Sequence, residues 1–300
     1  MAKSVVGYEK RCICMDNYEK KGYLVSDFRI FHLCDEPGEI PFHYHDFHKI
    51  IFFLNGNADY VIEGRSYHLE PRDIIFVAAG EIHRPVFLTP ARPYDRIVIY
   101  IAPDFLERWS ERDPQHADLS ACFRLAGETE HVMQQTAHKN HDQLFHINKL
   151  EKTARGEGFA NGLYTEILFM EFMIILHRSL LGHELKTQAK AVYDPKIQQV
   201  LAYIAEHLQE PLRVDDLAGL VYLSRYYLMR KFKEDTGYSI HQYIASKRLL
   251  LARELLHGEK PVTEISSDVG FADYSTFARA FRNYFHQSPT DYRESLRKRN

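Results

Sequence analysis

The chain has few of the features that mark secreted, membrane-bound or phosphate-binding proteins. Its 300 residues include four cysteines, whose spacing suits neither a disulfide framework nor a paired-cysteine metal site: Cys12, Cys14, Cys34 and Cys122. The first ten residues, MAKSVVGYEK, lack the apolar core of a secretory signal. We therefore expect a cytoplasmic protein whose thiols are inert.

Sequence motifs of enzymes are also missing. The chain has no glycine-rich phosphate loop, and no Ser-His-Asp spacing or isolated carboxylate pair indicates a catalytic centre. The apolar run NGLYTEILFMEFMIILHRSLLG, residues 161–182, is interrupted by Glu166, Glu171, His177 and Arg178. It is therefore not a clean membrane span and predicts a helix that packs on the protein, contacts a second copy, or does both. We expect no enzymatic activity, no cofactor and no membrane partner.

Strong charge of one sign is absent as well. The net charge is −3, and residues 196–300 carry 16 Lys plus Arg against 13 Asp plus Glu, a net of +3. A domain with this small excess has a weak field for nucleic acid. If it binds DNA, its affinity must come from well-placed arginines and from dimerisation, and must fall as salt is added.

One pattern occurs twice in the C-terminal third. The sequence SRYYLMRKF, from Ser224, returns 49 residues later as DYSTFARAF, from Asp273. Serine and aspartate are good helix N-caps, and the apolar residues that follow recur every four positions, so each copy predicts an amphipathic helix. The expected buried faces are Leu228 with Phe232 in the first copy, and Phe277, Phe281 and Phe285 in the second.

The opposite faces of these helices are basic and partly aromatic. Arg230 in the first copy aligns with Arg279 in the second. Outward arginines are commonly just solvated, but their recurrence in two copies favours a shared function. The outward residues are Arg225, Tyr226, Met229, Arg230 and Lys233 in the first copy, and Tyr274, Ser275, Ala278, Arg279 and Arg282 in the second.

A short helix is expected upstream of each copy, at residues 214–220 and 263–269. The upstream segments align at an offset of 48 rather than 49, so the second turn, which contains Gly270, is one residue longer. Two helices joined by a tight turn form the DNA-reading helix-turn-helix, whose second helix enters the major groove. Residues 239–258 predict one connecting helix of about 20 residues, or about 30 Å.

Residues 194–297 resemble the DNA-binding domain of the AraC family of transcription regulators. The resemblance rests on DDLAGLVYLSRYYLMRKFKEDTGYSIHQYI, on KRLLLARELL and on VTEISSDVGFADYSTFARAFRNYFHQSPTDYR. It covers about a third of the chain. Ser266 replaces the usual alanine, and His286 stands where glycine is common, but neither residue belongs to the outward faces.

The resemblance implies that Tyr226, Met229 and Arg230, and likewise Tyr274, Ser275 and Arg279, face base edges. Arginine can donate two hydrogen bonds to guanine O6 and N7, and apolar groups contact thymine methyls. The remaining basic residues are better placed for phosphates, which position a protein without specifying a sequence: Arg225, Lys233 and Arg282.

The N-terminal part has short apolar runs separated by Gly, Asn and Pro, which predict an antiparallel β-barrel or sandwich. Turns are expected at Asn55-Gly56, at Glu63-Gly64 and at residues 71–73. The candidate strands are KIIFFLN, ADYVIEG, RSYHLE, DIIFVAA and DRIVIYIA.

This region also contains a histidine constellation, PFHYHDFHK followed by AAGEIHRP. His43 and His45 are two residues apart, so on a strand both project to the same side, whereas His48 points to the opposite one. The two segments resemble the motifs of the cupin barrel, with His83 in the second. Lys49 stands where metal-binding cupins have a carboxylate, and a protonated lysine is no ligand.

Three interpretations of His43, His45 and His83 stay open. The residues form a three-histidine metal site, they line an organic ligand pocket together with Lys49, or they have no specific role. The ligand pocket is favoured, because the carboxylate is missing and a DNA-binding domain is attached. Lys49 would suit an anionic or hydroxyl-rich ligand.

These patterns predict an α+β protein in four parts. Residues 1–117 form a cupin-like sensor barrel, 118–182 a helical packing or dimerisation segment, 183–195 a linker, and 196–300 an all-α domain of two helix-turn-helix units joined by a long helix. The barrel is expected to carry packed helices.

The predicted function is a ligand-controlled transcription regulator. By family analogy it is an activator with a sugar-like effector, and its partners are double-stranded promoter DNA, a second copy of the chain and RNA polymerase. One alternative is a cupin metalloenzyme with an accessory helical domain. Another is a constitutive DNA-binding protein whose barrel only dimerises.

Overall fold

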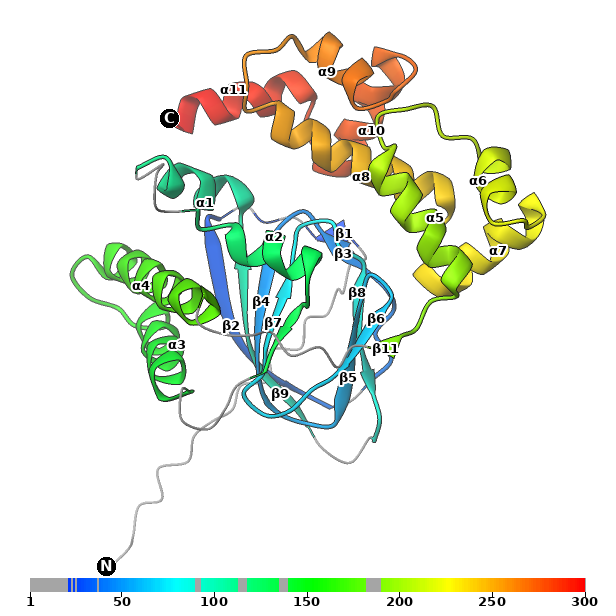
Figure 1. Cartoon of the computed structure of the whole chain (residues 1–300). Helices are drawn as coiled ribbons and strands as arrows, with labels where there is room; N and C mark the ends of the chain where they lie inside the picture. Colours follow the sequence, from blue (N-terminus) through cyan, green and yellow to red (C-terminus); the bar gives the residue numbers. More distant parts are fainter. Residues whose placement is uncertain are drawn as a thin grey trace, which may run out of the picture.

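Two β-sheets face each other in the N-terminal half (Figure 1). The computed structural model describes residues 21–22, 24, 26–36, 38–89, 93–112, 118–134, 140–181 and 190–299, so Cys12 and Cys14 lie outside the described residues. The strands of the first sheet, in spatial order, are β10 (Val132–Met133), β7 (Ile74–Val77), β4 (His48–Asn55), β9 (Tyr94–Ile101) and β2 (Phe28–Asp35). The second sheet contains β11 (Lys190–Ala191), β6 (Arg65–His68), β5 (Ala58–Ile62) and β8 (His83–Phe87).

Neighbouring strands within both sheets are antiparallel, as the turn signals predict. A separate parallel pair joins β1 (Lys21–Gly22) to β3 (Tyr44–His45). The sequence patterns did not predict β2 and β8, which lie at sheet ends. β8 contains Pro85, which cannot donate to a ladder and is tolerated at an edge.

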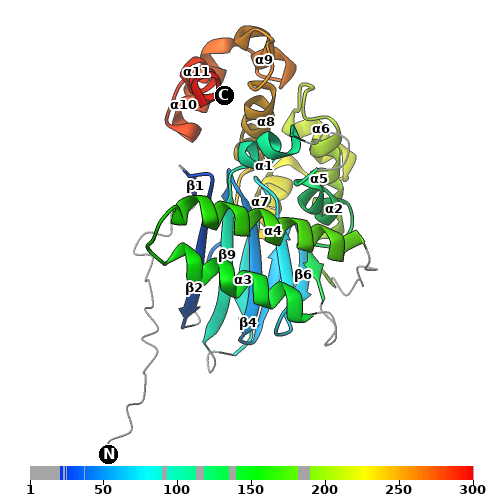
Figure 2. The ribbon, with the colours of Figure 1, turned by 90° about the vertical axis from the view of Figure 1, so that its left-hand side faces the viewer.

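Strand β4 is buried on both faces, which explains its continuous apolar run. Ile50 and Phe52 point toward the helices, whereas Ile51 and Phe53 point into the barrel. The helices that cover the outer face of the first sheet are α1 (Pro103–Ser110), α2 (Ala121–Glu128), α3 (Asn140–Ala154) and α4 (Asn161–Leu181), with α3 and α4 in front of the sheet in Figure 2. The barrel with packed helices is thus confirmed.

The stretch 118–182 is not helical throughout. It contains β10, which pairs with β7 and adds a strand to the first sheet. The predicted linker likewise contributes β11, which pairs with β6, and Asp194 caps the next helix by accepting a hydrogen bond from the Lys196 amide. Part of the linker prediction, residues 183–189, lies outside the described residues.

The C-terminal half is all-α. Its helices are α5 (Pro195–Glu206), α6 (Val214–Leu220), α7 (Arg225–Thr236), α8 (Ile240–Leu255), α9 (Val262–Asp268), α10 (Tyr274–Phe285) and α11 (Pro289–Arg299). The first helix-turn-helix is α6–α7 and the second is α9–α10, with α8 between them (Figure 1). α6 and α9 begin 48 residues apart, which confirms the predicted offset.

The connecting helix is shorter than predicted. α8 has 16 residues, or about 24 Å at 1.5 Å per residue, because Ser239 is its N-cap and the chain turns after Leu255. Ser239 and Gln242 form a capping box at its start. Among the described residues, none of the helices combines the length and apolar character needed to cross a bilayer.

Candidate DNA interface and effector site

The second helix of each helix-turn-helix begins at the predicted cap. The Ser224 side chain accepts a hydrogen bond from the Tyr227 amide, and the Asp273 side chain accepts one from the Thr276 amide. Below the caps, the expected apolar faces are buried: Leu228, Phe232, Phe277, Phe281 and Phe285 are at most 6% exposed. Their burial fixes which face of each helix points outward.

The predicted DNA-contacting side chains lie on those outward faces. All nine are exposed: Arg225, Tyr226, Met229, Arg230, Lys233, Tyr274, Ser275, Arg279 and Arg282. Arg225 forms an ion pair of 3.0 Å with Asp215, and Arg230 one of 3.6 Å with Glu234. Both pairs are more than half exposed, so they are weak and can be exchanged for phosphate or base contacts.

Tyr222 is a surface residue that the sequence analysis missed. It lies in the turn between α6 and α7, is 91% exposed and has φ +53°. At the offset of 48 it corresponds to Gly270, which has φ +88° in the turn between α9 and α10. Aligning the two turns would have shown that a bulky residue stands where the left-handed region favours glycine.

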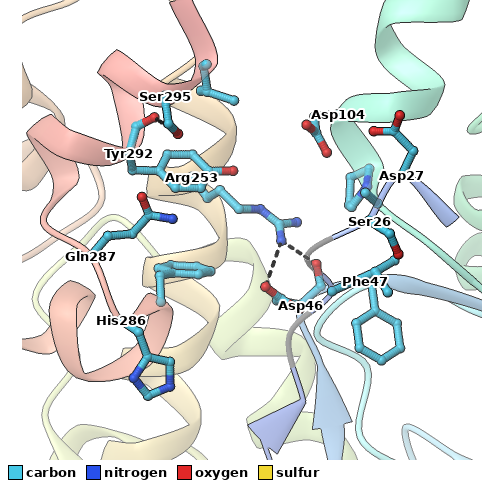
Figure 3. A pocket seen from close by; sticks show the side chains of 15 residues that line it. Ser26, Asp27, Asp46, Phe47, Asp104, Arg253, His286, Gln287, Tyr292 and Ser295 are labelled. Atoms are coloured by element: carbon cyan, nitrogen blue, oxygen red, sulfur yellow. Dashed lines mark hydrogen bonds and ion pairs between the residues drawn. The ribbon is translucent and has the colours of Figure 1, made fainter. Parts of the chain in front are cut away.

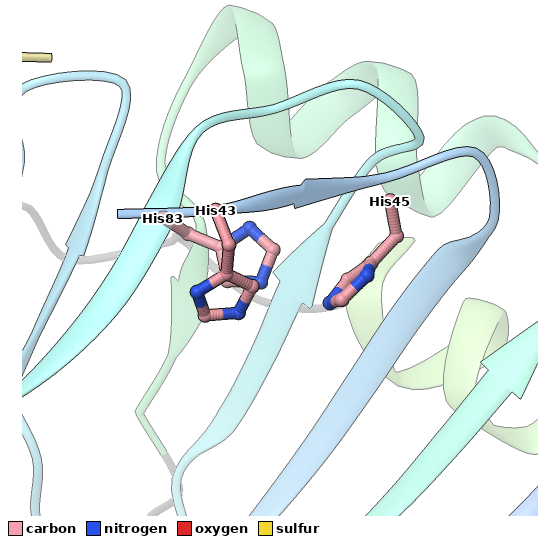
Figure 4. Close-up of side chains that lie close together, drawn as sticks. All are labelled: His43, His45 and His83. Atoms are coloured by element: carbon pink, nitrogen blue, oxygen red, sulfur yellow. The ribbon is translucent and has the colours of Figure 1, made fainter. Parts of the chain in front are cut away.

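In the barrel, His43, His45 and His83 come together (Figure 4). Backbone hydrogen bonds join His43 and His83 in both directions, at 3.1 and 2.9 Å, and bring two segments together that are 40 residues apart in the chain. The ring centroid of His43 lies 4.3 Å from that of His83 and 5.0 Å from that of His45. All three side chains are buried.

Two of these histidines are oriented by the backbone. His43 Nδ1 lies 2.9 Å from the Pro41 carbonyl oxygen, and His83 Nδ1 lies 2.8 Å from that of Glu81. An Nδ1–H that donates to a carbonyl leaves Nε2 as the ring nitrogen that carries the lone pair. By contrast, neither ring nitrogen of His45 has a hydrogen-bond partner among the described residues.

Lys49 completes the cluster. Its Nζ lies 3.4 Å from the Tyr60 hydroxyl and 3.4 Å from His83 Nε2. Burial, and then the charge of Arg96, lowers the Lys49 pKa to about 7, so the amine is partly neutral at neutral pH. Desolvation thus disfavours the ammonium form of Lys49 relative to that of an exposed lysine.

Burial also keeps the imidazoles neutral. It lowers the pKa of His43 to about 3, with Lys49 adding to the effect, and lowers those of His45 and His83 as well. His48 points away from the cluster, as predicted: its ring stacks on Phe123 with centroids 4.1 Å apart and accepts a hydrogen bond from the Ala79 amide. The cluster thus consists of neutral imidazoles, each of which has one ring nitrogen with a lone pair.

The barrel and the DNA-binding half share a buried apolar interface. Phe42 and Tyr44 pack in one cluster with side chains of α5, α7 and α8. The Tyr44 ring lies 5.0 Å from that of Tyr238 and 5.9 Å from that of Tyr284, to which it is almost parallel. The Tyr238 hydroxyl donates to the Phe42 carbonyl at 3.5 Å.

α8 adds two cations to this interface. Lys247 Nζ lies 3.0 Å from Glu63 Oε1 and donates at 3.0 Å to the Gly80 carbonyl. Burial alone would lower the Lys247 pKa, but Glu63 and other neighbours raise it, so Lys247 stays charged. Arg253 donates to the Asp46 carbonyl, as Figure 3 shows, and these contacts join α8 to both histidine-bearing segments.

A cavity of about 370 Å³ lies between the two halves, outside the barrel (Figure 3). Its walls include Asp46, Phe47 and Asp104 on the barrel side and Arg253, Phe285 and His286 on the other. Inside the barrel, aromatic rings pack against the histidines: the Phe47 ring stacks on His45 at 4.5 Å, Tyr100 lies 5.9 Å from His45, and Tyr60 lies 5.9 Å from His83. The histidine site is therefore a compact cluster rather than a wide pocket.

Two helix-turn-helix units with outward arginines, attached to a barrel with convergent polar side chains, define a DNA-binding regulator with a sensor domain. Residues 27–173 match the AraC-like ligand binding domain and residues 217–295 match a helix-turn-helix domain. The chain belongs to the AraC family of transcription regulators. This family is non-enzymatic, which removes the cupin metalloenzyme as an alternative.

Similar proteins include the HTH-type transcriptional activator RhaS of Shigella sonnei, 29% identical over 266 residues, which cover 85% of this chain and 88% of that protein. RhaS of Escherichia fergusonii is 29% identical over 264 residues, with 86% and 88% covered. Among solved structures, the DNA-binding domain of AdpA in complex with a target DNA is 31% identical, covers 36% of this chain and 97% of that one, and has a TM-score of 0.34.

Proposed function

We propose that this regulator is a transcription activator whose binding to promoter DNA is controlled by a small molecule at the histidine cluster and Lys49. Similarity to proteins described as transcriptional activators supports activation. By family analogy a sugar-like effector is favoured. Lys49 and Tyr60 supply hydrogen-bonding groups suited to hydroxyls or to an anion.

The alternation of side chains along residues 42–46 carries this proposal. His43 and His45 point into the cluster with His83, whereas Phe42, Tyr44 and Asp46 contact the DNA-binding half. Because successive residues of an extended segment face opposite sides, a shift on one side moves the groups on the other. The segment thus connects the candidate effector site directly to α8 and α10.

A second connection runs through the loop before His83. The Gly80 amide donates to the His45 carbonyl at 2.7 Å, and the Gly80 carbonyl accepts from Lys247 on α8. A Cβ at Gly80 would lie 2.1 Å from Leu250 Cδ1, and φ there is +82°, so glycine is required for this close approach. Both histidine-bearing segments therefore touch α8.

In this proposal the effector binds one arrangement of the interface better than the other. Only such a difference in affinity can shift the equilibrium between arrangements. α8 joins both helix-turn-helix units, so a change in its docking alters how α7 and α10 lie on DNA. Arg230 and Arg279 read guanines, Tyr226, Met229 and Tyr274 contact thymine methyls, Ser275 faces a base edge, and Arg225, Lys233 and Arg282 bind phosphates.

The test combines effector binding with DNA binding. The full chain is screened by thermal shift against monosaccharides, sugar acids and short carboxylic acids, and its DNA site is selected from random duplexes. We expect a compound that raises Tm and changes DNA affinity. In Tyr44→Ala and Tyr284→Leu it still raises Tm but changes DNA affinity at least about fivefold less, since the interface is disrupted.

A matched control is Phe159→Ala, which removes a fully exposed ring between α3 and α4 and is expected to behave as wild type. If no compound in the panel raises Tm, the barrel is an inert scaffold and the proposal is wrong. It is equally wrong if the compound changes the DNA affinity of the Tyr44→Ala and Tyr284→Leu variants as much as that of the wild type.

A further inference from the structure

We propose that His43, His45 and His83 bind a divalent transition-metal ion, which makes metal the first ligand of the candidate effector site. This inference deepens the proposed function, because it names the chemical class bound at the same cluster. One ligand nitrogen from each histidine lies within 4.8 Å of the others. With metal–nitrogen bonds of about 2.1 Å, bound nitrogens lie about 3–3.5 Å apart, so a small closure of the rings suffices.

The hydrogen bonds of His43 and His83 prepare both residues as ligands. Each ring has Nδ1 against a backbone carbonyl, at 2.9 and 2.8 Å, which fixes the ring plane and turns the Nε2 lone pair toward the cluster. A metal-ligating histidine almost always donates its other ring N–H in this way. The backbone thus supplies the supporting shell that such a site needs.

His45 supplies independent evidence. Its side chain is buried, and both ring nitrogens lack a hydrogen-bond partner among the described residues. A buried polar nitrogen without a partner costs about 1–3 kcal/mol, so native structures rarely leave one unsatisfied. Its ring lies 5.0 Å from His43 and 5.3 Å from His83, where a shared ion would satisfy it.

The donor set identifies the class of metal. Three imidazoles suit Zn²⁺, Co²⁺, Ni²⁺, Cu²⁺ or Fe²⁺, whereas Mg²⁺ and Ca²⁺ prefer oxygen. In the part of the chain that the structure describes, no carboxylate joins the three histidines, and Lys49 Nζ lies 3.4 Å from His83 Nε2. Three neutral imidazoles leave the remaining coordination positions of the ion open to solvent or to a small molecule.

The test uses the purified full chain stripped by a chelator and dialysed. Zn²⁺ binding is followed by titration calorimetry and elemental analysis, and Co²⁺ by its visible spectrum. We expect about one equivalent per chain with tetrahedral or five-coordinate character. His43→Gln and His45→Leu lower Zn²⁺ affinity at least about 100-fold, because each removes one of three ligands. His68→Ala, at an exposed histidine on β6, leaves the affinity unchanged.

Lys49→Glu adds the missing carboxylate and is expected to raise Zn²⁺ affinity at least about tenfold. Circular dichroism confirms that each variant is folded.

Less than about a tenth of an equivalent of any of the five metals overturns the inference, as does binding that both histidine variants retain. If metal binds without changing DNA affinity, the metal site stands and metal is not the effector. If an organic compound alone controls DNA affinity, the proposed function stands without the metal.

Discussion

Arg230 on α7 and Arg279 on α10 occupy equivalent positions in the internal repeat. They are the strongest candidates for contacts with DNA bases. Each follows its N-cap by six positions, and each is exposed on a helix whose opposite face is buried. Because the two positions are equivalent in two copies of one unit, we expect both arginines to make the same kind of contact with two stretches of DNA. Their neighbours Lys233 and Arg282 have the same charge but lie farther along the helices, where phosphate contact is expected.

Replacing Arg279 with alanine should relax the preference at one base pair and cost about 1–3 kcal/mol on the preferred sequence, because a bidentate guanine contact is lost. Binding to a library of single-base variants of the selected site measures this. Arg282→Ala is the control, and it should weaken binding to all sequences alike and reduce the salt dependence. A uniform loss in Arg279→Ala would instead make Arg279 a phosphate contact.

The turns of the two helix-turn-helix units need the same left-handed backbone conformation at one position, and different residues adopt it. Gly270 and Tyr222 both have positive φ, although only glycine adopts it without a steric penalty. A Cβ at Gly270 would lie 2.8 Å from the Arg248 guanidinium, which donates to the Leu208 and Glu210 carbonyls. Gly270 thus lets Arg248 tie α8 to the segment after α5.

We expect Gly270→Ala to lower the free energy of unfolding by about 1–3 kcal/mol, through backbone strain and displacement of the Arg248 side chain. Urea unfolding of the full chain measures the change. Gly219→Ala on α6 is the matched control, since a Cβ there meets nothing within 4 Å, and it should be neutral or stabilising by up to about 1 kcal/mol. Equal effects of both substitutions would contradict this account of the turn.

The outer face of α4 is a surface suited to the association of two chains. α4 buries Phe169, Phe172 and Met173 against the sheet while Leu163 is 61% and Ile167 52% exposed. We use the name α4 face for the exposed apolar side chains of α4 and of its neighbour α3. They are Phe145 on α3 and Leu163, Tyr164, Ile167 and Ile174 on α4. Such a patch marks an interaction site, and a symmetric dimer would bring four DNA-reading helices to two half-sites.

Ile167→Asp should therefore convert a dimer into a monomer and weaken binding to a two-half-site DNA at least about tenfold, because a buried charge is placed at the α4 face and the bivalent contact is lost. Sedimentation velocity and DNA titration measure the two effects. Leu88→Asp, at an exposed leucine outside this face, should change neither. A wild-type chain that sediments as a monomer at all concentrations would disprove the dimer.

Local sequence information was sufficient for the DNA-binding half. Caps, apolar spacing and the repeat involve residues within a few turns of one another, so α6, α7 and α10 fall within one residue of their predicted starts. The strands β4, β5, β6, β7 and β9 followed in the same way from their apolar runs and turns. The length of α8 was overestimated, because Gly258, taken as the end of the helix, follows a turn that begins after Leu255.

Caps, apolar spacing and strand alternation predict the outward and buried faces of α7 and α10, and they place His43 and His45 on one side of their segment. The cupin resemblance already grouped His83 with His43 and His45, and the structure brings the three side chains together. Only the packed fold shows that Lys49 is buried with a lowered pKa, and that Phe42 and Tyr44 pack on the DNA-binding half. These contacts join segments far apart in the chain, whose register depends on packing rather than on local propensity. The contacts between the barrel and the DNA-binding half therefore depend on the fold, whereas the outward faces of α7 and α10 follow from the repeat.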